Sequence, residues 1–136
     1  MYIPQINCYQ AHAAAQPFTF YILAKGNHAG KACLQPWVNC FSAHCQSQEA
    51  LDYYFWLTYS LWQAGKFKPF HRGSVIPFVS IKDVRSLIGQ AGPEVHPHWQ
   101  QIIQQLNKVH TLKAHLSQQI IATEKLQRCL LNAYFQ

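Results

Sequence analysis

The sequence predicts an α+β fold in which a mixed β-sheet with packed helices precedes a long C-terminal helix of the coiled-coil type. Short apolar segments that end at glycine-containing turns indicate strands in the first half of the chain. Residues 99–135 contain neither glycine nor proline, which indicates one uninterrupted helix. With 136 residues, the chain has room for one domain and one appendage. We therefore expect an α+β domain over residues 1–90, a linker over 91–98 and the helix over 99–135.

Two strands are predicted before the first helix. Residues 18–24 (FTFYILA) mix aromatic and aliphatic side chains and end at a turn that starts with Lys25 and Gly26. This turn continues through Gly30 and Lys31. Residues 37–45 (WVNCFSAHC) combine apolar with small polar side chains, which is typical of an interior strand.

The next segment predicts an amphipathic helix. Ser47 is a suitable N-cap, and Glu49 lies in the first turn, where the helix dipole favours an acidic side chain. Gly65 is suited to end the helix about sixteen residues later. The apolar face is formed by Leu51, Tyr54, Phe55, Thr58, Leu61 and Trp62. The aromatic run at residues 53–62 therefore indicates a helix core and not a platform for stacking bases.

A basic loop, a strand and a short helix are predicted next. After the basic residues 66–72, Gly73 and Ser74 favour a tight turn, and residues 75–79 favour a strand. Pro77 restricts that strand to a sheet edge or a bulge, because proline offers no ladder donor. Ser80, with Asp83 three residues later, indicates the start of a helix that runs to about Ile88.

The predicted long helix has an interrupted apolar seam. Its apolar residues recur in alternating steps of three and four, with polar interruptions at Lys113, Thr123 and Gln127. Such a seam indicates packing against another helix, as in a coiled coil. The residues expected to form this contact are Leu106, Val109, Leu116, Ile120 and Leu130.

Charge and cysteine content indicate the expected kind of partner and the expected cellular compartment. Eleven Lys and Arg against five Asp and Glu give a net charge of +6, which favours an anionic partner such as nucleic acid. The uncharged start of the chain contains Pro4 and Pro17 and lacks a basic n-region, so we expect neither a signal peptide nor a membrane span. Five cysteines without an export signal predict reduced thiols in a cytoplasmic protein.

Three motifs that would indicate an enzyme or a metalloprotein are weak. Residues 26–31 (GNHAGK) are one residue too short for a phosphate loop, and Ala32 replaces the Ser or Thr that binds magnesium. The cysteines and histidines lack zinc-ligand spacing. The five carboxylates are scattered, and no catalytic pattern is present. We therefore expect no catalysis, metal or cofactor. The cysteines and histidines nearest to such a spacing are Cys33, Cys40, His44, Cys45, His96 and His98.

The basic loops are the strongest candidate for a binding site. Basic side chains interleaved with aromatic and small polar ones have the chemistry to contact phosphates and base edges. A solvated basic surface without a partner is the alternative interpretation. The residues predicted to contact DNA are Lys25, Lys31, Lys66, Lys68, His71, Arg72 and Ser74.

Four segments occur in an order that resembles a known family. They are residues 21–45 (YILAKGNHAGKACLQPWVNCFSAHC), 50–63 (ALDYYFWLTYSLWQ), 73–84 (GSVIPFVSIKDV) and 96–106 (HPHWQQIIQQL). Together they resemble the second half of a target recognition domain from a type I restriction-modification specificity subunit, followed by that family's long helix. The segment that opens the family's helix is replaced here by residues 88–101 (IGQAGPEVHPHWQQ).

This resemblance implies a target-recognition-like fold, DNA binding without catalysis, and long helices that pair as a spacer and dock methyltransferase subunits. Two functional hypotheses follow. The first is a non-enzymatic DNA-binding module that dimerises through the long helix. The second is a protein-interaction module that binds another protein, such as a methyltransferase subunit, through that helix without binding DNA.

Overall fold

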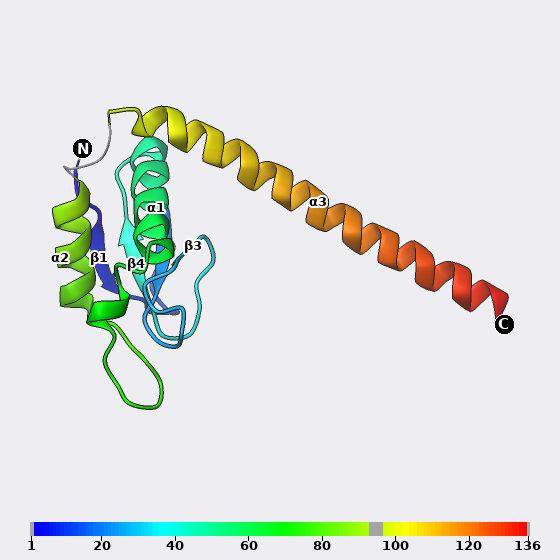
Figure 1. The fold of residues 1–136 in the computed structure, drawn as a ribbon, viewed down its shortest axis with the longest axis horizontal. Coiled ribbons are helices and arrows are strands. Elements are labelled where there is room, and N and C mark those ends of the chain that lie inside the picture. The colour runs from blue at the N-terminus through cyan, green and yellow to red at the C-terminus, as the bar shows by residue number, and fades with distance from the viewer. Residues whose placement is uncertain (1, 93–96, 136) are drawn as a thin grey trace. The chain divides into compact units, whose positions relative to one another are not determined.

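The computed structural model describes residues 2–92 and 97–135, and the chain divides into two units, Met1–Trp99 and Gln100–Gln136 (Figure 1). The first unit is an α+β domain, and the second is helical. The α+β class and the long helix are therefore confirmed. The linker predicted over residues 91–98 falls partly on 93–96, which lie outside the described residues and include His96.

The sheet of the first unit has four strands in the order β1-β4-β2-β3. They are β1 (Gln5–Cys8), β2 (Thr19–Leu23), β3 (Ala32–Cys33) and β4 (Cys40–His44). Every pair is antiparallel, so the prediction of a mixed sheet was wrong. The reason is that the strands are joined by short loops, whereas parallel neighbours need a long crossover.

The two predicted strands that precede the first helix are confirmed as β2 and β4, and β4 lies inside the sheet as expected. β4 begins at Cys40, later than predicted, because Trp37 and Val38 belong to an exposed loop. The sequence did not indicate β1 or β3. β1 pairs with β4, and Arg85 of the second helix donates from Nε to the carbonyl of Ile6 at 3.0 Å.

Two helices cover the apolar side of the sheet. These are α1 (Gln48–Gln63), which contacts β2 and β3, and α2 (Ile81–Ala91), which contacts β1. Alternate strand residues, among them Phe20 and Ile22, are fully buried, and the ring of Phe20 lies edge-on to Phe55 of α1 with centroids 5.9 Å apart. The opposite side of the sheet carries Thr19, Tyr21, Ser42 and His44, which alternate with these buried residues along β2 and β4.

Both predicted helix starts are confirmed. The hydroxyl of Ser47 accepts a hydrogen bond from the amide of Ala50 at 3.1 Å, and that of Ser80 accepts one from Asp83 at 3.1 Å. Gly65 lies just after α1 with a φ of 74°, a left-handed conformation that favours glycine. α2 continues past Ile88 to Ala91, because Gly89 is tolerated within its last turn.

The strand predicted over residues 75–79 was wrong. This segment is mostly loop, and only Phe78 forms isolated bridges, one to Lys25 and one to Arg72. Pro77 has no amide hydrogen to donate and limits the ladder at this point. A short 3₁₀-helix, η1 (Lys68–Phe70), precedes the loop.

All but the first residue of the helix α3 (Trp99–Tyr134, 36 residues) belongs to the second unit. It is about 54 Å long at the usual rise per residue. Four of the five predicted seam residues have side chains that are more than half exposed: Val109, Leu116, Ile120 and Leu130. Among the residues that the structure describes, no helix is both long and apolar enough to cross a membrane.

Candidate nucleic-acid interface

The turn between β2 and β3 brings the first two predicted basic residues into place. It is closed by hydrogen bonds from the amide of Leu23 to the carbonyl of Lys31 (3.0 Å) and from the amide of Gly30 to the carbonyl of Leu23 (2.7 Å). Gly26 and Gly30 have φ values of 96° and 100°, so both adopt conformations that other residues rarely take. Lys25 and Lys31 therefore lie at the two ends of one rigid turn.

Phe67 connects this turn to the basic segment after α1. Its side chain is 2% exposed and packs directly on Gly30. A Cβ atom at position 30 would lie 2.4 Å from Cγ of Phe67, so only glycine allows this contact. Because Lys66 and Lys68 flank Phe67, the contact holds both lysines beside the turn.

We expect Gly30→Ala to destabilise the first unit much more than Gly26→Ala does. Both glycines have positive φ, but an added Cβ at Gly26 meets no atom within 4 Å. Gly26→Ala should therefore cost only backbone strain of about 1–2 kcal/mol, whereas Gly30→Ala should cost about 3 kcal/mol or more through its clash with Phe67. Urea denaturation of the two variants measures this difference. Equal losses would show that Phe67 does not pack on Gly30.

Residues 71–78 join the same surface. The backbone of Lys25 pairs with Phe78, and Phe78 pairs in turn with Arg72. A ring nitrogen of His71 lies 3.0 Å from the carbonyl oxygen of Ala29, within the turn. Two basic segments that are far apart in the sequence are therefore adjacent in space, at the end of the unit where α1 terminates (Figure 1).

We call this surface the basic end. All seven predicted DNA-contacting residues lie on it or on the loop that it carries: Lys25, Lys31, Lys66, Lys68, His71, Arg72 and Ser74. Five of the seven are exposed, and Lys31 and His71 are partly buried. The amino group of Lys31 lies 5.0 Å from the ring centroid of Trp62, a cation–π contact.

The acidic residues of this unit are mostly remote from the basic end. Among those that the structure describes, Glu49 and Asp52 lie at the start of α1, at the opposite end of that helix from Lys66. Asp83 is the exception: its carboxylate forms a 3.2 Å salt bridge with Arg72, whose side chain remains 62% exposed. Arg72 can therefore still reach a ligand.

The negative end of the α1 dipole offers a purely structural reason for lysines here. A cation in this position contributes about 0.3–1 kcal/mol to helix stability. This effect fades within a turn of the helix end, so it applies to Lys66 and Lys68 and does not explain Lys25 or Arg72. Basic side chains therefore lie together at this end of the unit for a reason other than capping of α1.

Sequence reasoning missed the apolar residues at the basic end. Trp37 and Val38 are exposed on the loop before β4, and the carbonyl of Asn39 accepts from the amide of Ala24 at 2.9 Å. Val75 and Ile76 are exposed at the tip of the loop after Arg72. These residues looked like strand interiors, because a run of apolar side chains does not reveal whether a partner strand is present.

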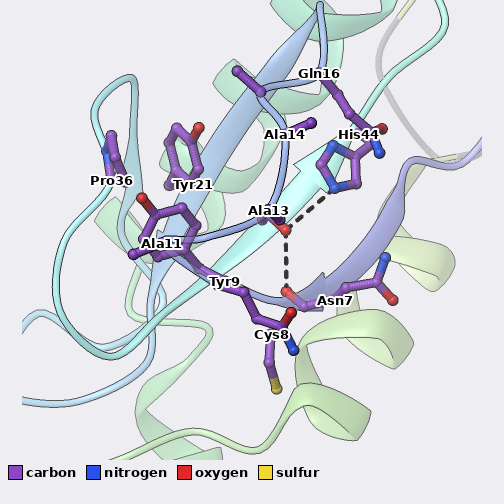
Figure 2. A pocket seen from close by; sticks show the side chains of 13 residues that line it. Asn7, Cys8, Tyr9, Ala11, Ala13, Ala14, Gln16, Tyr21, Pro36 and His44 are labelled. Atoms are coloured by element: carbon purple, nitrogen blue, oxygen red, sulfur yellow. Dashed lines mark hydrogen bonds between the residues drawn. The ribbon is translucent and has the colours of Figure 1, made fainter.

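A pocket of about 670 Å³ on the open side of the sheet is a second candidate site. Figure 2 shows His44, Tyr9 and Tyr21 on its walls, with the loop around Ala13 crossing it. The two tyrosine rings meet edge-on with centroids 5.5 Å apart. Burial, and then the neighbouring Tyr9, raise the pKa of Tyr21, so its phenol stays neutral at physiological pH.

His44 lies between two hydroxyl groups. Its Nδ1 is 2.9 Å from the hydroxyl oxygen of Thr19, which also donates to the carbonyl of Gln16 at 3.0 Å. Nε2 of His44 faces the hydroxyl of Ser42 at 3.3 Å, and that hydroxyl also lies 3.4 Å from the carbonyl oxygen of Asn7 (Figure 2).

This serine–histidine pair does not form a nucleophilic site with its own strand. β4 lies between β1 and β2, so the sheet ladders use its backbone amides, and they are not free to stabilise an oxyanion. No Lys, Arg, Asp or Glu side chain lines the pocket in the part of the chain that the structure describes. The pocket therefore lacks the cluster of Lys and Arg side chains that binding to a polyanion requires.

The cysteines and His44 are not arranged as a metal site. Among the described residues, no three or more His, Cys, Asp or Glu side chains are grouped closely enough to hold a metal ion. Burial raises the pKa of Cys45 to about 11 and also raises the pKa of Cys33 and Cys40. These thiols therefore stay protonated at neutral pH when no metal is bound, and they are poor nucleophiles.

Comparison with known proteins identifies one family. A family described as a family of unknown function (DUF6943) matches residues 6–133, which is nearly the whole chain. No curated protein and no solved structure matches this chain.

Proposed function

We propose that this protein, which belongs to the DUF6943 family of unknown function, is a non-enzymatic module that binds duplex DNA through the basic end. One observation carries the proposal: the structure joins the turn at Lys25 to the segment at Lys66–Arg72 through Phe67, His71 and Phe78. Positive side chains on several adjacent loops suit a backbone of regularly spaced phosphates, which a single lysine-bearing turn does not.

The pocket on the sheet has no Lys or Arg in its described lining, which supports the same choice of surface. A polyanion gains binding energy where it replaces counterions with Lys and Arg, and in the described part of this unit those side chains concentrate at the basic end. Lys25, Lys66 and Lys68 are exposed, so they can reach phosphates without first breaking a salt bridge.

We further propose that α3 pairs with α3 of a second copy. A helix of 36 residues with an apolar seam gains stability when that seam is covered. Two copies would present two basic ends to one duplex, which raises the effective affinity of each. The resemblance to restriction-modification specificity subunits stays a prediction, and the proposal does not depend on it.

The direct test is fluorescence anisotropy of a labelled random-sequence duplex across a salt titration, with light scattering on the same sample. We expect a dimer whose affinity falls about 100-fold or more between about 50 and 200 mM salt, because four or more phosphate contacts release counterions. An absence of binding at the lowest salt would contradict the proposal.

The exposed seam of α3 also favours a second candidate, a protein-interaction module that binds a different protein through this helix. It predicts a monomer in isolation, a stoichiometric complex with the partner, and no affinity for duplex DNA. The same anisotropy and light-scattering measurements separate the two candidates.

A further inference from the structure

The loop at residues 73–77 has an unusually exposed apolar tip. The side chain of Val75 is 88% exposed, the highest value among the large hydrophobic residues that the structure describes, and the adjacent Ile76 is 63% exposed. Single exposed apolar residues are common and need no explanation. Two in succession at the tip of a basic loop form a contiguous apolar surface that water does not favour.

Hydrogen bonds hold this loop at both of its ends. Arg72 and Phe78 exchange two backbone hydrogen bonds of 2.9 Å each, which close the loop at its base. The carbonyl of Pro77 accepts from the amide of Gly26 at 2.8 Å, which ties the loop to the turn after β2. The tip is therefore a supported projection, as the loop beyond the sheet in Figure 1 shows.

Gly73 makes the tight fold of the loop sterically feasible. Its φ is 90°, and a Cβ atom at this position would lie 2.6 Å from the carbonyl oxygen of Ile76. Any other residue would push the chain at Ile76 away. The shape of the tip therefore depends on Gly73. This glycine has no side chain, so it could not itself contact a ligand through charge or a side-chain hydrogen bond.

The charges around the loop indicate its partner. Lys25 and Arg72 lie on either side of Phe78 at the base of the loop, so cations flank the apolar tip. Duplex DNA has the complementary layering, with phosphates outside and an apolar base stack inside. One or two apolar side chains are enough to insert at a base step, whereas stable membrane anchoring requires more apolar area or a second anchor.

We propose that Val75 and Ile76 form a wedge that inserts between adjacent base pairs while Lys25 and Arg72 bind the flanking phosphates. This inference rests on the proposed DNA-binding function and adds how the duplex is deformed. Apolar wedges of this kind unstack one base step and kink the duplex by about 20–90°. Binding should therefore favour flexible pyrimidine–purine steps, which unstack most easily.

The test uses the full chain and a duplex of about 25 base pairs that carries fluorophores at both ends and 2-aminopurine at a central TA step. We expect the wild type to raise both energy transfer and 2-aminopurine fluorescence. The variant Val75→Ser with Ile76→Ser should lose both signals and about ten-fold in affinity, with the salt dependence unchanged because its cations remain. Gly73→Ala, which removes no apolar side chain, should also reduce both signals.

Ile3→Ser provides the matched control. Ile3 is 54% exposed, and it precedes Gln5, which pairs with His44 at the end of the sheet away from Lys25. This variant should bend and unstack the duplex as the wild type does. Circular dichroism of each variant checks that the fold is intact.

The outcomes separate this inference from the function on which it rests. Salt-dependent binding by the wild type without bending or unstacking would overturn the wedge and leave the DNA-binding function standing. Retention of both signals by the double serine variant would also overturn the wedge. No binding to duplex at low salt would overturn both, and sedimentation with phosphatidylglycerol vesicles that depends on Val75 and Ile76 would reassign the tip to a membrane surface.

Discussion

Replacing Lys66 and Lys68 together with glutamate is expected to weaken binding of the full chain to a random-sequence duplex by about 100-fold or more at low salt. Both side chains are exposed, and neither has an ion-pair partner among the described residues. The variant removes two phosphate contacts and places two like charges opposite the DNA backbone. The slope of log affinity against log salt should fall by about two, one for each lost contact. Anisotropy at several salt concentrations measures both quantities.

Lys108→Glu with Lys125→Glu is the control for this prediction. It makes the same change in net charge, but on exposed positions of α3 that lie outside the predicted seam. It should reduce affinity only slightly at moderate salt, where distant charges are screened. An equal loss in the two variants would show that binding follows net charge alone and that the basic end is not the DNA-binding surface.

The second large effect is expected in α3. Leu116→Glu with Ile120→Glu should convert the dimer into a monomer at micromolar concentrations, because pairing would bury four carboxylates in an apolar seam. The dissociation constant should rise by about 1,000-fold or more, since each buried unpaired charge costs several kcal/mol. Sedimentation equilibrium measures the change in mass and association constant.

Thr111→Glu with Gln118→Glu serves as the control, because both residues lie on the side of the helix opposite the seam. This variant adds the same charge and should remain dimeric. A wild-type protein that is already monomeric would contradict self-pairing and favour the protein-interaction module. A dimer that survives the substitutions at Leu116 and Ile120 would show that copies associate through another surface.

Local sequence signals predicted the helices well because their causes are local. Ser47 and Ser80 cap helices with their own hydroxyls, and the amides they satisfy lie three residues away. The long helix needed only an uninterrupted stretch of residues with adequate helix propensity. Strand predictions depended on distant partners, and so residues 75–79, which looked like a strand, form a loop instead.

β1 is the opposite case, a strand that the sequence did not predict. Gln5 and Asn7 are polar and alternate with Ile6 and Cys8, a pattern too short to predict a strand without its partner. The segment becomes a strand because β4 offers a free edge and because Arg85 binds its backbone. Pairing with β4 thus overrides a weak local preference, as is usual for short strands.

For the candidate site, the order of amino acids was enough to predict which side chains are basic and that glycines surround them, and it contains no catalytic or zinc pattern. It did not predict that these residues share one surface. Phe67 on Gly30, His71 beside Ala29 and Phe78 between Lys25 and Arg72 join segments that no local rule connects. Charge is a property of a single residue, whereas proximity depends on the packing and backbone pairing of the whole unit.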